Sequence, residues 1–105
     1  MTKEEQMDYP TLILLVKFTS SLTFDEVKKV VISRKEDFKA LEGLQQKYYL
    51  QEPATQQFAG LYLWKSQEDF SSYRDSELRK TIASAYKTIG EPRIEVFNVI
   101  DTLRE

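Results

Sequence analysis

The chain has 105 residues, of which 41% are hydrophobic and 30% are charged, and its formal net charge is −2. This length predicts one domain with a single core, and the weak negative charge, with no run of Lys or Arg, argues against a nucleic-acid partner. The sequence contains no Cys and no His, which removes disulfides, thiolate chemistry and the commonest ligands of haem and transition metals.

Residues 1–10 read as a polar N-terminal lead, and residues 11–105 are expected to fold as one domain. The lead lacks the pattern of a secretory signal, and no apolar run is long enough to span a membrane. A soluble cytoplasmic protein with no membrane partner is therefore the default expectation.

Residues 11–19 are expected to form a strand that is covered on both faces, because both sets of alternate side chains are mostly apolar. A helix should follow, since Thr23 and Glu26 have the spacing of a capping box and Gly43 is a suitable terminator. The apolar residues of this helix at helical spacing are Phe24, Val27, Val30, Val31, Phe38 and Leu41.

Two further strands are predicted, at residues 44–51 and 58–66, joined by a loop of several residues. The second is the clearest element in the chain, and again neither of its faces is polar before Lys65. One face carries Phe58, Gly60, Tyr62 and Trp64, and the other carries Ala59, Leu61 and Leu63. This strand is expected to be buried on both sides.

Ser66 is expected to open a second helical region, because Ser66 and Asp69 resemble a capping box. An interruption is predicted near residues 75–76, and Gly90 is expected to terminate the region. The apolar residues of this region are Phe70, Tyr73, Leu78, Ile82, Ala85, Tyr86 and Ile89. Pro92 suits the start of a last strand over residues 93–100, where Asn98 is expected to be a buried amide.

The predicted order is β-α-β-β-α-β, which indicates an α+β, ferredoxin-like fold with a four-stranded antiparallel sheet. Both helical regions pack on one face of the sheet in this topology. Since the first and third strands are apolar on both faces, the remaining face needs a cover, and a second copy of the chain is the simplest one. A homodimer formed through the sheet faces is expected.

The segments Gly43–Leu44, Lys47, Gly60–Trp64 and Glu68–Phe70 give the chain a resemblance to the dimeric α/β-barrel superfamily over residues 11–103. It is most similar to the YdhR-like monooxygenase branch. The resemblance implies two sheets paired into a barrel, with a pocket between each sheet and its helices. Known activities in the superfamily include cofactor-independent oxygenation of aromatic polyketides, haem degradation and lactone isomerisation.

The expected pocket lies on the helix-facing side of the central aromatic strand. Gly60 leaves space there, and apolar walls with a few hydroxyls would suit a small aromatic or quinone-like molecule. The candidate pocket residues are Tyr48, Gly60, Tyr62, Trp64, Phe70, Tyr73 and Tyr86. Lys47 is a candidate donor to an enolate oxygen at the pocket mouth. The competing interpretations are that the aromatic residues are core and that Lys47 faces solvent.

Two departures from the family pattern bear on the chemistry. Gly60 stands where monooxygenase members can carry an Asn, and Tyr73 stands where many relatives have a His. The resemblance therefore implies the pocket without identifying catalytic residues. Two hypotheses follow: a cofactor-independent monooxygenase acting on a hydrophobic molecule, or a non-enzymatic, dimeric small-ligand-binding or stress-related module. In either case no haem or metal cofactor is expected.

Overall fold

Four antiparallel strands form one sheet in the computed structural model, which describes residues 9–104. The strands are β1 (Leu12–Ser20), β2 (Leu44–Gln51), β3 (Phe58–Trp64) and β4 (Thr88–Asn98), in the spatial order β2-β3-β1-β4. The helices are α1 (Phe24–Lys39), α2 (Gln67–Arg74), α3 (Glu77–Lys80) and α4 (Ile82–Tyr86). Residues 1–8 of the expected polar lead lie outside the described residues.

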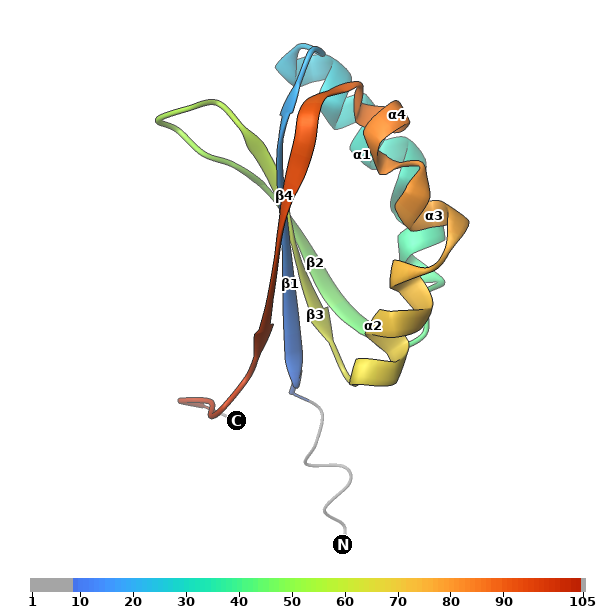
Figure 1. Ribbon diagram of the computed structural model, residues 1–105, viewed down its shortest axis with the longest axis vertical. Coiled ribbons are helices and arrows are strands. Elements are labelled where there is room, and N and C mark those ends of the chain that lie inside the picture. Colours follow the sequence, from blue (N-terminus) through green and yellow to red (C-terminus); the bar gives the residue numbers. More distant parts are fainter. Residues whose placement is uncertain (1–8, 105) are drawn as a thin grey trace, which may run out of the picture.

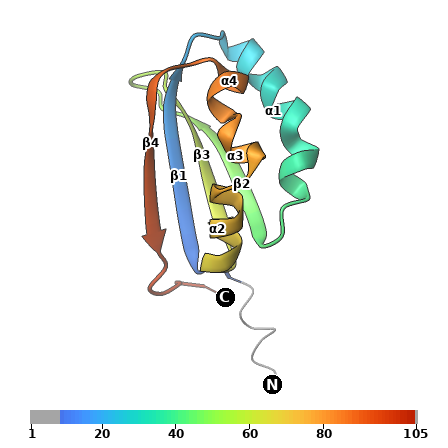
Figure 2. The ribbon, with the colours of Figure 1, turned by 45° about the vertical axis from the view of Figure 1, so that its right-hand side comes forward.

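All of the helices lie on the same side of the sheet (Figure 1). Turning the view shows α1 beside β2 and α2 in front of β3, with β4 at the edge of the sheet farthest from α1 (Figure 2). This arrangement confirms the predicted α+β, ferredoxin-like fold. None of the helices within residues 9–104 is both long and apolar enough to cross a membrane.

The alternation of side chains along β1 and β3 determines where the core lies. β1 pairs with β3 so that Val16 faces Gly60, and the same register places one set of each strand under the helices. That set is buried, as predicted, and meets apolar side chains from the helices, including Leu78 of α3. The core residues are Leu12, Leu14, Val16, Phe18, Val27, Phe38, Tyr62, Trp64, Phe70, Tyr73, Ile82 and Tyr86.

The predicted helix starts are confirmed. The Thr23 hydroxyl accepts from the Glu26 amide (3.2 Å), and the Thr23 amide donates to the Glu26 carboxylate (2.8 Å), which completes a capping box. Ser66 accepts from the Asp69 amide (3.1 Å) and donates its hydroxyl proton to the Asp69 carboxylate (2.9 Å). The Asp69 carboxylate thus binds the Ser66 hydroxyl, where a capping-box Glu would bind the backbone.

The predicted helix ends are wrong at both glycines. α1 ends at Lys39, before the turn that contains Gly43. The second helical region ends at Tyr86 because Lys87 takes the left-handed conformation (φ 48°) and acts as its C-cap, so Ile89 and Gly90 belong to β4. Pro92 lies inside β4, where an edge strand tolerates a missing N–H. The expected burial of Asn98 is wrong: this residue is exposed, because it ends β4 at the edge of the sheet.

The face of the sheet opposite the helices is left bare by the helices of the described chain (Figure 1), and its centre is apolar, with Lys17, Arg93 and Glu95 toward one side. Register places Leu15 beside Leu61 and Ile13 beside Leu63 on this face, and all four are only partly buried. Phe97 of β4 extends the same surface and is 51% exposed.

Gly43 lies just before β2 and brings the start of that strand against the start of α2. Its backbone has a φ of +82°, and a Cβ atom there would overlap the carboxylate group of Asp69. The Gly43 carbonyl also accepts from the Lys65 amide (2.8 Å) at the end of β3. Position 43 requires a glycine for two reasons: the backbone is left-handed there, and Asp69 leaves no space for a side chain.

We expect Gly43→Ala to lower the free energy of unfolding by about 2–4 kcal/mol, combining left-handed strain with displacement of the Asp69 side chain. Gly90→Ala is the matched control, because Gly90 has a φ of +75° and no atom within 4 Å of the added Cβ. It should cost only the strain of about 1 kcal/mol. Equal losses in urea denaturation would show that the Asp69 contact contributes nothing.

Candidate functional site

The amino group of Lys47 lies among three aromatic rings on the helix-facing side of β2. Its Nζ atom is 3.4 Å from the ring centroid of Phe38, 4.4 Å from that of Tyr62 and 4.6 Å from that of Tyr49. β2 and β3 place Lys47 directly opposite Tyr62, while α1 supplies Phe38. The sequence-based alternative, a solvent-facing lysine, is therefore wrong.

Gly60 provides the space in which Lys47 lies. A Cβ atom at Gly60 would come within 3.2 Å of the Lys47 Cε atom and within 3.0 Å of the Tyr62 ring. Both distances are shorter than ordinary van der Waals contacts, so a side chain at this position would displace the lysine stem or the ring. Gly60 thus makes room for neighbouring side chains of the same sheet.

Burial lowers the pKa of Lys47 to about 7, and the nearby positive charge of Arg34 acts in the same direction. The three ring faces favour the ammonium form and oppose this shift. Among residues 9–104, no carboxylate forms an ion pair with Lys47. The amine is thus both an acid and a base near neutral pH.

Arg34 holds its charge close to this site while bridging two helical regions. Its guanidinium group donates to the Leu78 carbonyl (2.9 Å) and to the Thr81 hydroxyl (3.2 Å), and it lies over the Phe38 ring. Its Nε atom is buried without a hydrogen-bond partner in the described chain. Arg34 therefore keeps a positive potential beside the amine of Lys47.

Tyrosine hydroxyls supply the remaining polar atoms. The Tyr73 hydroxyl donates to that of Tyr62 (3.2 Å) within the core. Burial raises the pKa of Tyr49, Tyr62 and Tyr73, and it raises the pKa of Tyr86 to about 12. These hydroxyls are protonated at neutral pH and can donate hydrogen bonds, but they cannot serve as bases.

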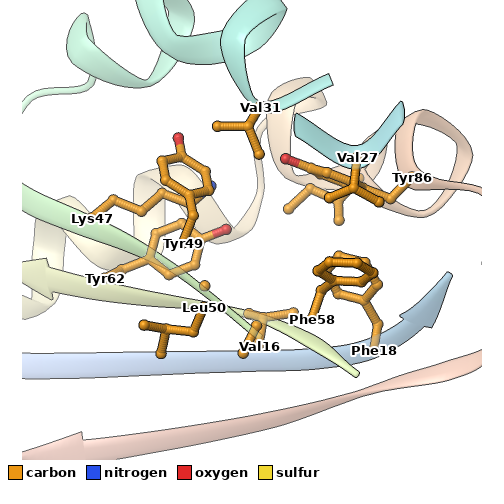
Figure 3. Close-up of a pocket in the computed structure, with 13 residues that line it drawn as sticks. Val16, Phe18, Val27, Val31, Lys47, Tyr49, Leu50, Phe58, Tyr62 and Tyr86 are labelled. Atoms are coloured by element: carbon orange, nitrogen blue, oxygen red, sulfur yellow. The ribbon is translucent and has the colours of Figure 1, made fainter. Parts of the chain in front are cut away.

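A small cavity lies between the sheet and the helices, with a volume of about 30 Å³ (Figure 3). The close-up shows the Lys47 amine and the Tyr62 hydroxyl on one side of it and the rings of Phe18 and Phe58 on the other. Its lining also includes Val16, Val27, Val31, Tyr49, Gly60, Ile82 and Tyr86. The space is large enough for one or two water-sized molecules and has mostly apolar walls.

Two open grooves adjoin this cavity along the edge of the sheet. One, of about 320 Å³, is lined by Lys47 and Tyr49 together with Lys35, Phe38 and Leu44. The other, of about 390 Å³, runs between α1 and β2. Tyr49 lines the cavity and both grooves, and Lys47 lines the cavity and the first groove. A molecule in the first groove can therefore contact the amine.

The structure brings together four of the candidate residues around the cavity: Lys47, Gly60, Tyr62 and Tyr86. Trp64, Phe70 and Tyr73 lie beside them in the core, with Trp64 fully buried and stacked on Tyr62. The Trp64 indole N–H has no partner within residues 9–104.

Tyr48 does not join this group. It pairs with Leu61 on the opposite face of the sheet and is half exposed. Because neighbouring residues of a strand point to opposite faces, Tyr48 cannot share a pocket with Lys47. The strand alternation that excludes Tyr48 also selects Tyr49, which sequence reasoning overlooked.

Arg34 was also overlooked, although the sequence contains a signal for it. Val27, Val31 and Phe38 share the core-facing side of α1, and position 34 falls within the same helical spacing. A charged residue on an apolar stripe usually has a specific partner or role.

Within residues 9–104, no cluster of three or more His, Cys, Asp or Glu side chains could hold a metal ion.

Comparison with protein families gives a match over residues 13–105 to the family described as "Putative mono-oxygenase ydhR". A search of curated protein sequences finds no significant match. Several solved structures share the fold at low sequence identity.

One of these structures is SnoaB, a cofactor-independent oxygenase from Streptomyces nogalater, with 16% identity and a TM-score of 0.72, covering 91% of this chain and 99% of that one. A dimeric ferredoxin-like protein of unknown function from Thermobifida fusca has 13% identity and a TM-score of 0.68, covering 88% and 93%. NE2512 of Nitrosomonas europaea, also of unknown function, has 13% identity and a TM-score of 0.73, covering 92% and 96%.

We expect the free energy of unfolding to rise by about 2 kcal/mol between pH 7 and pH 9, measured by urea denaturation. The Lys47 pKa is about 7 in the folded chain against an ordinary lysine value of 10.5, so in this window the unfolded chain binds the extra proton. Raising the pH removes that advantage of the unfolded state. Lys47→Met should abolish the rise, and a Met variant that keeps the full slope would contradict the assignment.

Proposed function

The chain belongs to the YdhR mono-oxygenase family, and from this premise we propose that it is a cofactor-independent monooxygenase in which Lys47 is the catalytic base. The substrate is a small hydrophobic molecule, aromatic or quinone-like, with an acidic C–H bond or hydroxyl group. The observation that supports this most directly is the lysine amine with a pKa of about 7 beside an apolar cavity. A general base works best when its pKa lies near the operating pH.

The neutral Lys47 amine would take a proton from the substrate and become an ammonium group next to the resulting anion. The ammonium, with the charge of Arg34 nearby, would stabilise the anion next to the mostly apolar cavity. The electron-rich anion then reacts with O₂. For a CH₂ group, one oxygen atom becomes the new carbonyl oxygen and the other leaves as water.

The volumes of the inner cavity and the first groove suggest where O₂ and the organic substrate would each bind. The inner cavity, of about 30 Å³, is too small for an aromatic ring system but comparable to a dioxygen molecule. The groove of about 320 Å³ has room for a larger molecule against Lys47. The organic substrate would lie in the groove and O₂ in the cavity, with the amine between them.

Oxygen uptake with anthrone as the probe tests this proposal. The wild-type protein should accelerate uptake, and Lys47→Met should reduce the acceleration about a hundredfold or more, as expected for loss of a general base. The rate should rise with pH around a midpoint near 7, since only the neutral amine accepts a proton. Lys80→Met is the control, because Lys80 is an exposed residue of α3 paired with Glu77, and it should retain full activity.

Undiminished activity of Lys47→Met would refute the role of the amine. If folded wild-type protein binds anthrone without any oxygen uptake above that of buffer, the oxygenase proposal fails. That second result would favour the alternative, a non-enzymatic ligand-binding module.

We also propose a homodimer in which two copies bury the sheet faces that lack helices. Leu15, Leu61 and Leu63 make the centre of this face apolar, and Phe97 and Tyr48 extend it. A contiguous apolar surface of this kind is unusual on a monomer and typical of a permanent interface. The fold relative from Thermobifida fusca is described as dimeric, which is consistent with this proposal.

Leu61→Lys should convert the dimer to a monomer, because two copies would place a charge in the centre of the apolar face. Ile32→Lys is the matched control, since Ile32 is a 64% exposed apolar residue on α1, and it should leave the dimer intact. Light scattering coupled to size exclusion at micromolar concentration measures both. A monomeric wild type would refute the proposed interface.

A further inference from the structure

We propose that Lys47 also acts as a nucleophile, forming an imine with small aldehydes or ketones that carry an apolar substituent. This activity is distinct from oxygenation, since it needs neither O₂ nor an acidic substrate. It rests on the position of the amine, which is enclosed by rings, unpaired with any described carboxylate and reachable from an open groove.

The first requirement is a free electron pair on nitrogen. With a pKa of about 7, half of the Lys47 amines are neutral at pH 7, roughly a thousandfold more than for a lysine with the ordinary pKa of 10.5. A carboxylate partner would stabilise the ammonium and suppress this neutral form. Lys47 has no such partner in the described chain, whereas Lys17, Lys39 and Lys80 each form an ion pair.

The second requirement is access for the carbonyl compound. Lys47 is only partly buried and forms part of the wall of the 320 Å³ groove. The rest of the lining is mixed: Phe38, Leu44 and Tyr49 are apolar or aromatic, and Lys35, Lys39, Gln45 and Gln46 are polar. The apolar part of the lining would hold the substituent of the carbonyl compound while its carbonyl carbon meets the amine.

The third requirement is that the product be stabilised. Nζ attacks the carbonyl carbon to form a C–N bond, and a proton moves from nitrogen to oxygen to give a carbinolamine. Loss of one water molecule then gives the C=N bond, so aldehyde and amine are converted to imine and water. The protonated imine keeps a positive charge on nitrogen, which the rings of Phe38, Tyr49 and Tyr62 would stabilise as they do the ammonium.

Reductive trapping with benzaldehyde and sodium cyanoborohydride at pH 7 tests the inference on the intact wild-type protein. Peptide mapping by mass spectrometry should show benzylation of Lys47 at least tenfold faster than that of Lys80. Lys80 is the internal reference because its side chain is 62% exposed and its charge is paired with Glu77. The reaction is run under nitrogen, so its result is independent of the oxygenase proposal.

The pH dependence of labelling separates a reactive amine from one that is merely accessible. Labelling of Lys47 should reach half its maximum near pH 7. Labelling of Lys47 no faster than that of Lys80, or without a midpoint near 7, would overturn the inference. Both outcomes are read from the wild-type chain, so no variant has to fold.

Discussion

The missing side chain of Gly60 is the constraint on which the site depends. Lys47 on β2 and Tyr62 on β3 both occupy space that any larger residue at position 60 would fill. With that space open, the lysine stem passes close to Gly60 and its amine reaches the rings of Phe38 and Tyr62. The absence of a Cβ atom at Gly60 therefore allows the pairing of β2 with β3 to place the Lys47 amine where its pKa is lowered.

The groups around the Lys47 amine provide no negative charge to balance it. Phe38 and Tyr62 offer ring faces in place of a carboxylate, and Arg34 adds a second positive charge that is held by helix carbonyl and hydroxyl groups. A buried amine in such surroundings is costly in its charged form. The protein thereby sacrifices stability near neutral pH, which is common where a fold positions reactive groups.

Local sequence patterns predicted the elements that depend on local chemistry. The capping residues Thr23 and Ser66 and the alternation along β3 gave correct starts and correct faces, because these are determined by neighbours in the chain. The helix ends predicted at Gly43 and Gly90 were misplaced. Lys87 takes the left-handed C-cap conformation that was expected of Gly90. Gly43 is needed for its close contact with Asp69, a residue that is distant in sequence.

The site was predicted in part for the same reason. Gly60, Tyr62 and Lys47 follow from alternation and from family resemblance, but the identity of the atoms that fill the space beside Gly60 depends on the pairing of β2 with β3. The lowered pKa of Lys47 depends on Arg34 and on burial, which no spacing along one strand reveals. Strand alternation alone would have identified Tyr49, rather than Tyr48, as the tyrosine on the same face of β2 as Lys47.

Tyr49 has a consequence for how much space a ligand can find. Tyr49 lines the inner cavity and both grooves, so part of the boundary of each space is the same residue. Side chains move between staggered rotamers, whereas packed sheets and helices do not separate easily. Rotation of the Tyr49 side chain would therefore change the space available where the cavity meets the grooves, with no movement of the sheet or of the helices.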